Sequence, residues 1–331
     1  ISGLLLASDV HLPLRIDGGA SAELLRTHIQ AGSLQDHGGS VQVSDSRLVI
    51  RDGFFGQSEA ILGGGHVWAL DSDVEIIDTQ LRDGLSLGDG GSVMFVDTIG
   101  VHHLVVERCS FKGNWARDRG GALAVAVTDP GSATVVNTTF RDNEATTGGA
   151  LSAGLDGSDG PLVLDDCTFT ANTAIEGGAV ELGGSATVLR SGFCGNSARQ
   201  GSALWIGGEG VIDIGNSRFF DNVASGDGAI GGSIGALDLV LRHDHFVGNA
   251  GQRRSVVDLQ AEVDSPGIVE VRDNLVVGST ARSSTGGTST MGFTDVAPGV
   301  VHVHNNLWHL NVGGEMSAGI VELGGVHQDP R

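Results

Sequence analysis

One short phrase recurs through the middle of the chain with constant internal spacing. It reads Phe-x-x-Asn-x-Ala, followed by a small pair that is usually Gly-Gly, then Ala and an aliphatic residue. Five consecutive copies, and a sixth that keeps the first half, begin at Phe111 and Asn114, Phe140 and Asn143, Phe169 and Asn172, Phe193 and Asn196, Phe219 and Asn222, and Phe246 and Asn249. The first five Phe lie 29, 29, 24 and 26 residues apart. A repeat of this length indicates a solenoid, in which each unit buries its apolar face against its neighbours.

The residue types within one unit favour β-structure over helix. Each unit is rich in Val, Thr, Phe and Gly, and the positions five and seven before each Phe are apolar, which is the alternation of a strand. The position two before the Phe is small and is expected to face the interior: Cys109, Thr138, Cys167, Ser191 and Ser217. The positions five and two before the Phe differ in parity, so the chain must bend between them if both face the interior. Asn137, Asp166 and Asn216 occupy this bend, and Asn and Asp tolerate the left-handed backbone of a tight turn. The unit therefore predicts an all-β, three-sheet solenoid of about eleven or twelve coils.

This repeat resembles the Phe-x-x-Asn and Gly-Gly-Ala-Ile/Leu/Val repeats of the polymorphic outer-membrane protein family. The resemblance implies a right-handed parallel β-helix of the pectin-lyase-like type, exposed at a bacterial cell surface. It does not specify an activity, because that fold hosts lyases, hydrolases, esterases, adhesins and phage spikes. Asn305–Trp308, Gly313–Gly314 and Asp329–Arg331 resemble the closing coils of bacterial surface β-helix proteins that carry a separate anchor. We therefore expect the chain to be a piece of a longer polypeptide.

We expect one β-helix domain over residues 1–331. Residues 1–37 are expected to form an N-terminal cap or degenerate coils, with a helical leaning at Ala20–His28. Regular repeats are expected over 38–250 and degenerate coils over 251–331.

The repeat is weaker on both sides of its clearest copies. Before them, we assign Phe54 and Leu81 to the Phe position and Gln57 and Gly84 to the Asn position. After them, Arg253–Val256 occupies the place of Gly-Gly-Ala, which we interpret as decay of the repeat.

Charge excludes some partners. The chain has 19 Lys and Arg against 40 Asp and Glu, a net charge of −21, so we expect no nucleic-acid partner, because phosphate contacts need clustered basic residues. No stretch approaches 18 apolar residues, so no transmembrane segment is expected. We predict no cofactor, with calcium binding by the acidic loops as the alternative.

The Phe and Asn columns are expected to be structural. Stacked Phe rings would form an internal aromatic ladder, in preference to an exposed stripe for sugar stacking. The Asn side chains would form a ladder at a turn, in preference to a set of ligands or glycan contacts.

Acidic residues near turns are the first candidates for chemistry. Asp156 and Asp159 lie in an expected loop, and Asp165 and Asp166 lie beside a bend. The β-helix lyases that resemble this fold use clustered Asp with calcium and an Arg or Lys base. Solvated turn carboxylates are the competing interpretation, which we favour because no Gly-Gly-x-Gly-x-Asp calcium repeat is present.

Two histidine clusters are the other candidates. His302 and His304 alternate onto one face of a strand and would bind zinc given a third ligand. His243 and His245 likewise share a face, and Asp244 between them would suit acid–base chemistry. Spacing fixes no set of three ligands, so we assign no catalytic, cofactor or metal role. Motifs that we associate with polygalacturonases, pectin methylesterases and alginate epimerases are absent.

Together these observations favour a non-enzymatic extracellular or cell-surface protein associated with the outer membrane. It would be an adhesin or structural stalk that presents loops and sheet faces to a protein or glycan, or that self-associates. The alternative is a carbohydrate-active enzyme, a polysaccharide lyase or glycoside hydrolase, that uses acidic loop residues. An enzyme should show a groove with several carboxylates, or Asp with Arg, converging from neighbouring coils.

Overall fold

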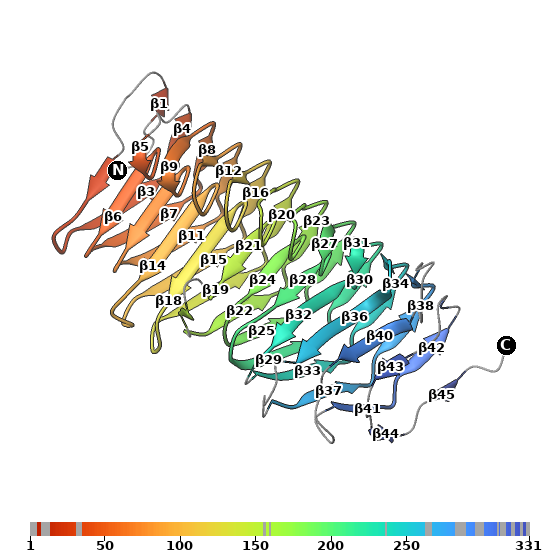
Figure 1. Ribbon diagram of the computed structural model, residues 1–331. Coiled ribbons are helices and arrows are strands. Elements are labelled where there is room, and N and C mark those ends of the chain that lie inside the picture. The colour runs from red at the N-terminus through yellow and green to blue at the C-terminus, as the bar shows by residue number, and fades with distance from the viewer. Residues whose placement is uncertain are drawn as a thin grey trace.

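The computed structural model is a rod of β-strands (Figure 1). It describes residues 5–7, 14–30, 35–154, 157–158, 160–235, 237–261, 267–281, 289–294, 301–309, 311, 316–318, 322–324 and 327–328. The chain advances coil by coil, with its N-terminus at one end of the rod and its C-terminus at the other. Within these ranges no helix has the length and apolarity needed to cross a membrane.

The described strands form three long parallel sheets, which confirms the predicted three-sheet parallel β-helix. The first sheet contains β1 (Leu5–Ala7), β4 (His28–Gln30), β8 (Phe54–Gly56), β12 (Gln80–Arg82), β16 (Ser110–Lys112), β20 (Thr139–Arg141), β23 (Thr168–Thr170), β26 (Gly192–Cys194), β30 (Arg218–Phe220), β34 (His245–Val247), β38 (Leu275–Val277), β42 (Leu307–His309) and β45 (His327–Gln328). The second sheet contains β2 (Leu14–Ile16), β6 (Val41–Ser44), β10 (Val67–Leu70), β14 (Val93–Asp97), β18 (Leu123–Val127), β21 (Leu151–Ala153), β24 (Val180–Leu182), β28 (Leu204–Ile206), β32 (Ile230–Ile234), β36 (Arg254–Ala261), β40 (Ser289–Thr294) and β43 (Met316–Ala318).

The third sheet contains β3 (Ser21–Leu25), β7 (Arg47–Arg51), β11 (Asp73–Ile77), β15 (His103–Glu107), β19 (Ser132–Val136), β22 (Leu162–Asp165), β25 (Ala186–Leu189), β29 (Gly210–Gly215), β33 (Leu237–Arg242), β37 (Val269–Arg272), β41 (Val301–His304) and β44 (Glu322–Gly324). Two short sheets run between the first and second sheets: β5 (Gln35–His37), β9 (Glu59–Gly63), β13 (Leu85–Ser86) and β17 (Trp115–Ala116), and then β27 (Ser197–Gln200), β31 (Val223–Asp227), β35 (Ala250–Gly251) and β39 (Thr280–Ala281). Each regular coil thus visits the third, first and second sheets in turn.

A left-handed bend separates the third-sheet strand from the first-sheet strand of each regular coil. The predicted bend residues Asn137, Asp166 and Asn216 have φ of 48°, 53° and 55°, which confirms the bend. The same position is also left-handed at Arg26, Asp52, Asp78, Arg108, Arg190, His243, Asp273 and Asn305. Arg and His are uncommon in this conformation, so the register of the sheets, and not the residue alone, holds the bend.

The six Phe of the repeat are fully buried and stack along the rod axis. Neighbouring ring centroids between Phe111 and Phe246 lie 4.6–4.9 Å apart, and the ring planes differ by 3–10°. This spacing equals the distance between hydrogen-bonded strands, because each Phe is paired in register with the Phe of the next coil.

The Asn of each repeat binds both neighbouring coils. In the buried Asn143, the backbone N–H and the Nδ2 atom both donate to the Oδ1 atom of Asn172, each at 3.0 Å. The Nδ2 atom also donates to the carbonyl of Phe111 at 3.2 Å. Asn114, Asn172, Asn196 and Asn222 repeat this pattern, and Asn249 closes it. The buried amides are thereby satisfied within the ladder.

Two assignments in the weaker early coils are wrong by one residue. Phe55, and not Phe54, is buried and pairs with Leu81 in the Phe column. The ring of Phe54 points outward and lies 4.5 Å from the ring of His28. In the same way Gln57 takes the left-handed position, with φ of 53°, and Ser58 occupies the column of Gly84.

The helical leaning at 20–28 is also wrong. Those residues contain β3 and the first residue of β4, with a left-handed Arg26 between the two strands. Each residue of β3 pairs in register with β7, and Leu24 is fully buried. Tertiary pairing and an apolar inward face therefore override the helix propensity of Ala, Glu and Leu.

Replacing Phe169 with Ala should lower the free energy of unfolding by about 3–5 kcal/mol, because it removes a fully buried ring between two stacked rings and leaves a cavity. Urea denaturation followed by circular dichroism measures the change. Phe54→Ala is the matched control, since its ring is partly exposed, and should cost less than half as much. Equal losses in the two variants would contradict the internal ladder.

Candidate functional site

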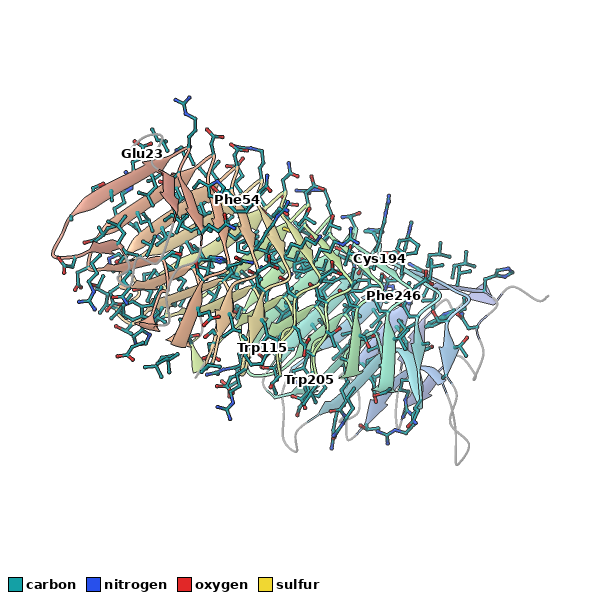
Figure 2. All side chains as sticks on the ribbon, turned by 90° about the horizontal axis from the view of Figure 1, so that it is seen from above. Glu23, Phe54, Trp115, Cys194, Trp205 and Phe246 are labelled. Carbon is teal, nitrogen blue, oxygen red and sulfur yellow. The ribbon has the colours of Figure 1, made fainter. Side chains whose placement is uncertain are left out.

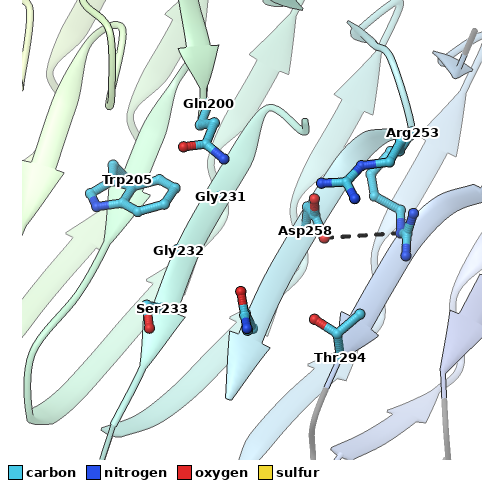
Figure 3. Close-up of a pocket in the computed structure, with 10 residues that line it drawn as sticks. Gln200, Trp205, Gly231, Gly232, Ser233, Arg253, Asp258 and Thr294 are labelled. Carbon is cyan, nitrogen blue, oxygen red and sulfur yellow. Dashed lines mark ion pairs between the residues drawn. The ribbon is translucent and has the colours of Figure 1, made fainter. Parts of the chain in front are cut away.

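A groove of about 380 Å³ lies on the outer face of the second sheet, over β28, β32, β36 and β40 (Figure 3). Its lining consists of Gln200, Trp205, Gly231, Gly232, Ser233, Arg253, Arg254, Asp258, Gln260 and Thr294. These residues come from four successive coils, so the groove exists only in the folded rod.

Strand register places the floor of the groove. Alternate residues of a strand point to opposite faces, and the outward residues Trp205, Gly231, Asp258 and Gly292 pair in one row across the four strands. Ser233, Gln260 and Thr294 pair in the next outward row. The groove therefore presents an aromatic ring, a carboxylate, an amide and two hydroxyl groups on one surface.

Two arginines flank this floor. Arg254 begins β36, and Arg253 precedes it. Val257, and not Val256, pairs with Ile230, so the assignment of Arg253–Val256 to the Gly-Gly-Ala place is wrong by one residue. The Nε atom of Arg254 lies 4.0 Å from the Oδ1 atom of Asp258, and the two side chains are 11% and 16% exposed (Figure 3). A Cβ atom at Gly292 would overlap that Nε atom, so the glycine makes room for the guanidinium. The register between β36 and β40 also shifts between Arg254 and Val257, as in a β-bulge.

The indole of Trp205 is partly exposed beside the neighbouring Gly231. A Cβ atom built on that glycine would lie 3.2 Å from the Cε3 atom of the indole, so even the smallest side chain would crowd the ring. Trp205 lies on a different face of the rod from Cys194 of the first sheet (Figure 2). The ring thus borders a polar surface with two guanidinium groups and one carboxylate.

Of the predicted acidic candidates, Asp165 and Asp166 do not line this groove. Asp165 ends β22 on the third sheet and forms an ion pair with Arg190, and Asp166 is the exposed left-handed bend residue. Asp156 and Asp159 lie outside the described residues.

His243, Asp244 and His245 are adjacent in sequence but do not share a surface. Both histidines are exposed, whereas Asp244 is fully buried and points into the rod. The acid–base arrangement proposed for them is therefore wrong, because Asp244 occupies the interior position two residues before Phe246.

Asp244 belongs to an internal column of hydrogen-bond donors. In other coils, Cys109 and Cys167 donate through Sγ to the carbonyls of Ile76 and Val135, each at 3.3 Å. Asn274 and Asn306 donate through Nδ2 to Leu241 and Val271. The corresponding carbonyl for Asp244 belongs to Ile214, which pairs with Leu241.

Burial raises the pKa of the Asp244 carboxyl to about 8. Its Oδ1 atom accepts from the backbone N–H of Ser217 at 2.8 Å, while its Oδ2 atom has no partner. A protonated Oδ2 would act as the donor that this column requires, and an ionised one would face a carbonyl.

The free energy of unfolding should therefore fall as pH rises from about 4 to about 8, because the unfolded chain releases the proton of Asp244 in that window while the folded chain retains it. Asp244→Asn should remove this component and exceed the wild type in stability at pH 8. Asp166→Asn is the control, since it removes an exposed charge at a bend where Asn137 already occurs. Urea denaturation across this pH range measures both. If Asp244→Asn is less stable than the wild type at pH 8, the assignment is overturned.

His302 and His304 share the outward face of β41, as predicted from their alternation. The Nε2 atom of His304 lies 3.4 Å from the Oε1 atom of Glu270, which also binds Arg272 at 2.9 Å. Among the residues that the structure describes, three potential metal ligands come together at Asp71, Asp97 and His102, and not at these histidines.

The Asp71–Asp97–His102 cluster anchors a loop. The buried carboxylate of Asp97 accepts from the backbone N–H groups of Gly100 and His102, at 3.2 and 3.1 Å, and lies 3.1 Å from the Nδ1 atom of His102. Asp71 accepts from the backbone and hydroxyl of Thr98 at 2.7 and 2.9 Å. These oxygens are already committed to the loop, which lies at the end of β14 and away from the groove.

The comparisons with known proteins support the fold alone. The crystal structure of the periplasmic alginate epimerase AlgG matches with a TM-score of 0.50 and 8% sequence identity, over 87% of this chain and 77% of that one. No protein-family model and no curated protein sequence matches the chain. At this identity the similarity establishes a β-helix architecture and says nothing of the groove.

Proposed function

We propose that the protein is a surface-exposed β-helix that binds an acidic polysaccharide in the groove around Trp205, without cleaving it. The observation that carries the proposal is a partly exposed indole that lines one groove with two guanidinium groups on the outer face of the second sheet. The resemblance of the repeat to the polymorphic outer-membrane protein family supports a location outside the cell.

The indole supplies a platform for sugar rings. A pyranose ring has an apolar face of C–H groups that packs on an aromatic ring, while its hydroxyl groups need hydrogen-bond partners. Ser233, Gln260 and Thr294 offer those partners in the row next to Trp205.

The arginines favour an acidic sugar. Guanidinium groups bind carboxylates through paired hydrogen bonds of fixed geometry. The groove carries Arg253 and Arg254 against the single carboxylate of Asp258, whereas the chain as a whole carries −21. Its local charge balance is therefore opposite to that of the whole chain.

The number of carboxylates in the groove supports binding without hydrolysis. Glycoside hydrolysis ordinarily needs two carboxyl groups about 5–10 Å apart on either side of the bond. In the described lining of the groove, Asp258 is the one acidic side chain, and it faces Arg254.

One observation favours the enzymatic alternative as a second candidate. Asp258 lies with two arginines in one groove, and an arginine that neutralises a sugar carboxylate lowers the cost of removing the neighbouring C–H proton. Such a protein would be a polysaccharide lyase, and its products would contain an unsaturated sugar. Incubation of each bound polymer with the protein, followed by ultraviolet absorbance of the unsaturated ring, separates the two functions.

Trp205→Ala should weaken binding of uronic-acid polysaccharides by about tenfold, since it removes the stacking platform, a loss of roughly 1–1.5 kcal/mol. Binding is measured by isothermal titration after a screen of uronic-acid, sulfated and neutral polysaccharides. Trp115→Ala is the matched control, because Trp115 is partly exposed on β17 and does not line the groove. The proposal is overturned if no polysaccharide binds, or if both variants bind as the wild type does.

Arg253→Gln should reduce the preference for acidic over neutral polysaccharides by about tenfold, because it removes one charge-assisted pair. The side chain of Arg253 is exposed, so the fold should be unaffected. Arg141→Gln changes an exposed arginine on the first sheet and serves as control. An unchanged preference in Arg253→Gln would exclude recognition of the sugar carboxylate at this position.

A further inference from the structure

A second hollow, of about 280 Å³, lies over β2, β6 and β10 of the same sheet, near the N-terminal end of the rod. Trp68, Arg15, Gln42 and Ser44 line it together with His37 and two aspartates. The ring of His37 stacks on Trp68 with centroids 4.4 Å apart, and the Nε atom of Arg15 donates to the Oε1 atom of Gln42 at 2.9 Å. This hollow repeats the residue types of the Trp205 groove: an indole, an arginine, a carboxylate, an amide and a hydroxyl.

Strand register places the two tryptophans in one outward column. Trp68 of β10 and Trp205 of β28 are joined through the paired residues Met94, Ala124, Ser152 and Glu181. Five strand steps separate them along the rod, a distance of roughly 24 Å at the spacing of parallel strands. The strands of this sheet follow one another along the rod (Figure 1), so the column runs parallel to its axis.

The column between the two indoles holds Met94, Ala124, Ser152 and Glu181. Ala124 and Ser152 are fully buried, Met94 and Glu181 are partly exposed, and the carboxylate of Glu181 accepts a hydrogen bond from Ser152. Beside this column, the residues that follow β21, β24 and β28 are Gly154, Gly183 and Gly207, which have no side chain. A linear polymer that spans the distance therefore passes over Met94 and Glu181 and beside these three glycines.

The two hollows differ in charge. The Trp205 groove has two arginines and one aspartate, whereas the Trp68 hollow has Arg15 with Asp17 and Asp36. A sugar carboxylate is favoured at the first and disfavoured at the second, because like charges at close range repel. The Trp68 hollow suits a sugar that carries hydroxyl or amide groups and no acid.

We propose that the two hollows are the ends of one binding track, occupied by a single polysaccharide that alternates acidic and uncharged sugars. This inference rests on the proposed function, since it extends the Trp205 groove to a second subsite. The polymer lies along the rod axis with an acidic sugar at Trp205 and an uncharged sugar at Trp68. Fragments too short to reach both indoles gain nothing from the second.

The test compares fragments of two polymers by isothermal titration to the full chain. The probes are disaccharides and decasaccharides of hyaluronan, which alternates uronic acid with N-acetylhexosamine, and of a homopolymer of uronic acid. The hyaluronan decasaccharide should bind at least about tenfold more tightly than its disaccharide, because two stacking sites act on one chain. Trp68→Ala should abolish this gain and leave disaccharide binding unchanged, whereas Trp68→Phe should restore most of it. Thermal unfolding of each variant checks that the fold is retained.

The outcomes separate this inference from the proposed function. If the fragments depend on Trp205 but bind equally at both lengths, or if Trp68→Ala is without effect, the track is overturned and the Trp205 groove stands. If the uronic-acid homopolymer gains as much from length as hyaluronan does, the assignment of an uncharged sugar at Trp68 is wrong. If no fragment of either polymer binds, the proposed function fails and the track fails with it.

Discussion

In-register pairing between successive coils is the constraint on which the rest of this molecule depends. Residues paired across parallel strands lie one strand spacing apart, about 4.8 Å. A position that holds Phe in successive coils therefore stacks ring on ring, at the observed 4.6–4.9 Å. A position that holds Asn binds amide to amide, and a position with a left-handed backbone repeats that backbone even where the residue is Arg or His.

Because of the same register, a coil whose outward residues differ from those of its neighbours changes the shape of the surface. Outward positions do not form stacked columns of one residue type as the interior positions do, and their residues vary from coil to coil. Where Trp205 is followed by Gly231 in the next coil, the missing side chain leaves space beside the ring. Where Asp258 is followed by Gly292 in the next coil, the guanidinium of Arg254 lies over the glycine. The groove is thus the product of large and absent side chains alternating in one column.

The fold can be predicted because the spacing of the repeat fixes which residues pair in successive coils. The wrong residue assignments arise where that pairing is not applied. Ile50 and Leu48 lie five and seven residues before Phe55 and are buried, so the alternation of the later coils identifies Phe55 and excludes Phe54. The rule that the position two before Phe faces inward likewise places Asp244 inside.

Selecting candidate residues by type, as acids and histidines, does not find the groove. Its signal is positional: Arg254 stands in the place of the first Gly of the repeat, and Trp205 directly follows an inward aliphatic residue. Its depth and charge balance depend on residues that pair between coils although they lie about 26–34 positions apart in sequence, which spacing alone cannot combine.

The charge of the whole chain opposes an acidic ligand at long range, whereas the groove attracts one at contact, and the two effects act over different distances. Repulsion from the net charge of −21 is spread over a long rod and is screened beyond about 8 Å at physiological ionic strength. A guanidinium in contact with a carboxylate acts at hydrogen-bond distance, where salt screens it less and the partly buried position of Arg254 strengthens it. Contact therefore decides the affinity, whereas the distant charge slows the approach of polyanions at low salt. Under the proposed function, such a rod would reject polyanions that lack a match to the groove. It would retain one whose acidic sugar meets the arginines while its uncharged sugars pass over the rest of the face.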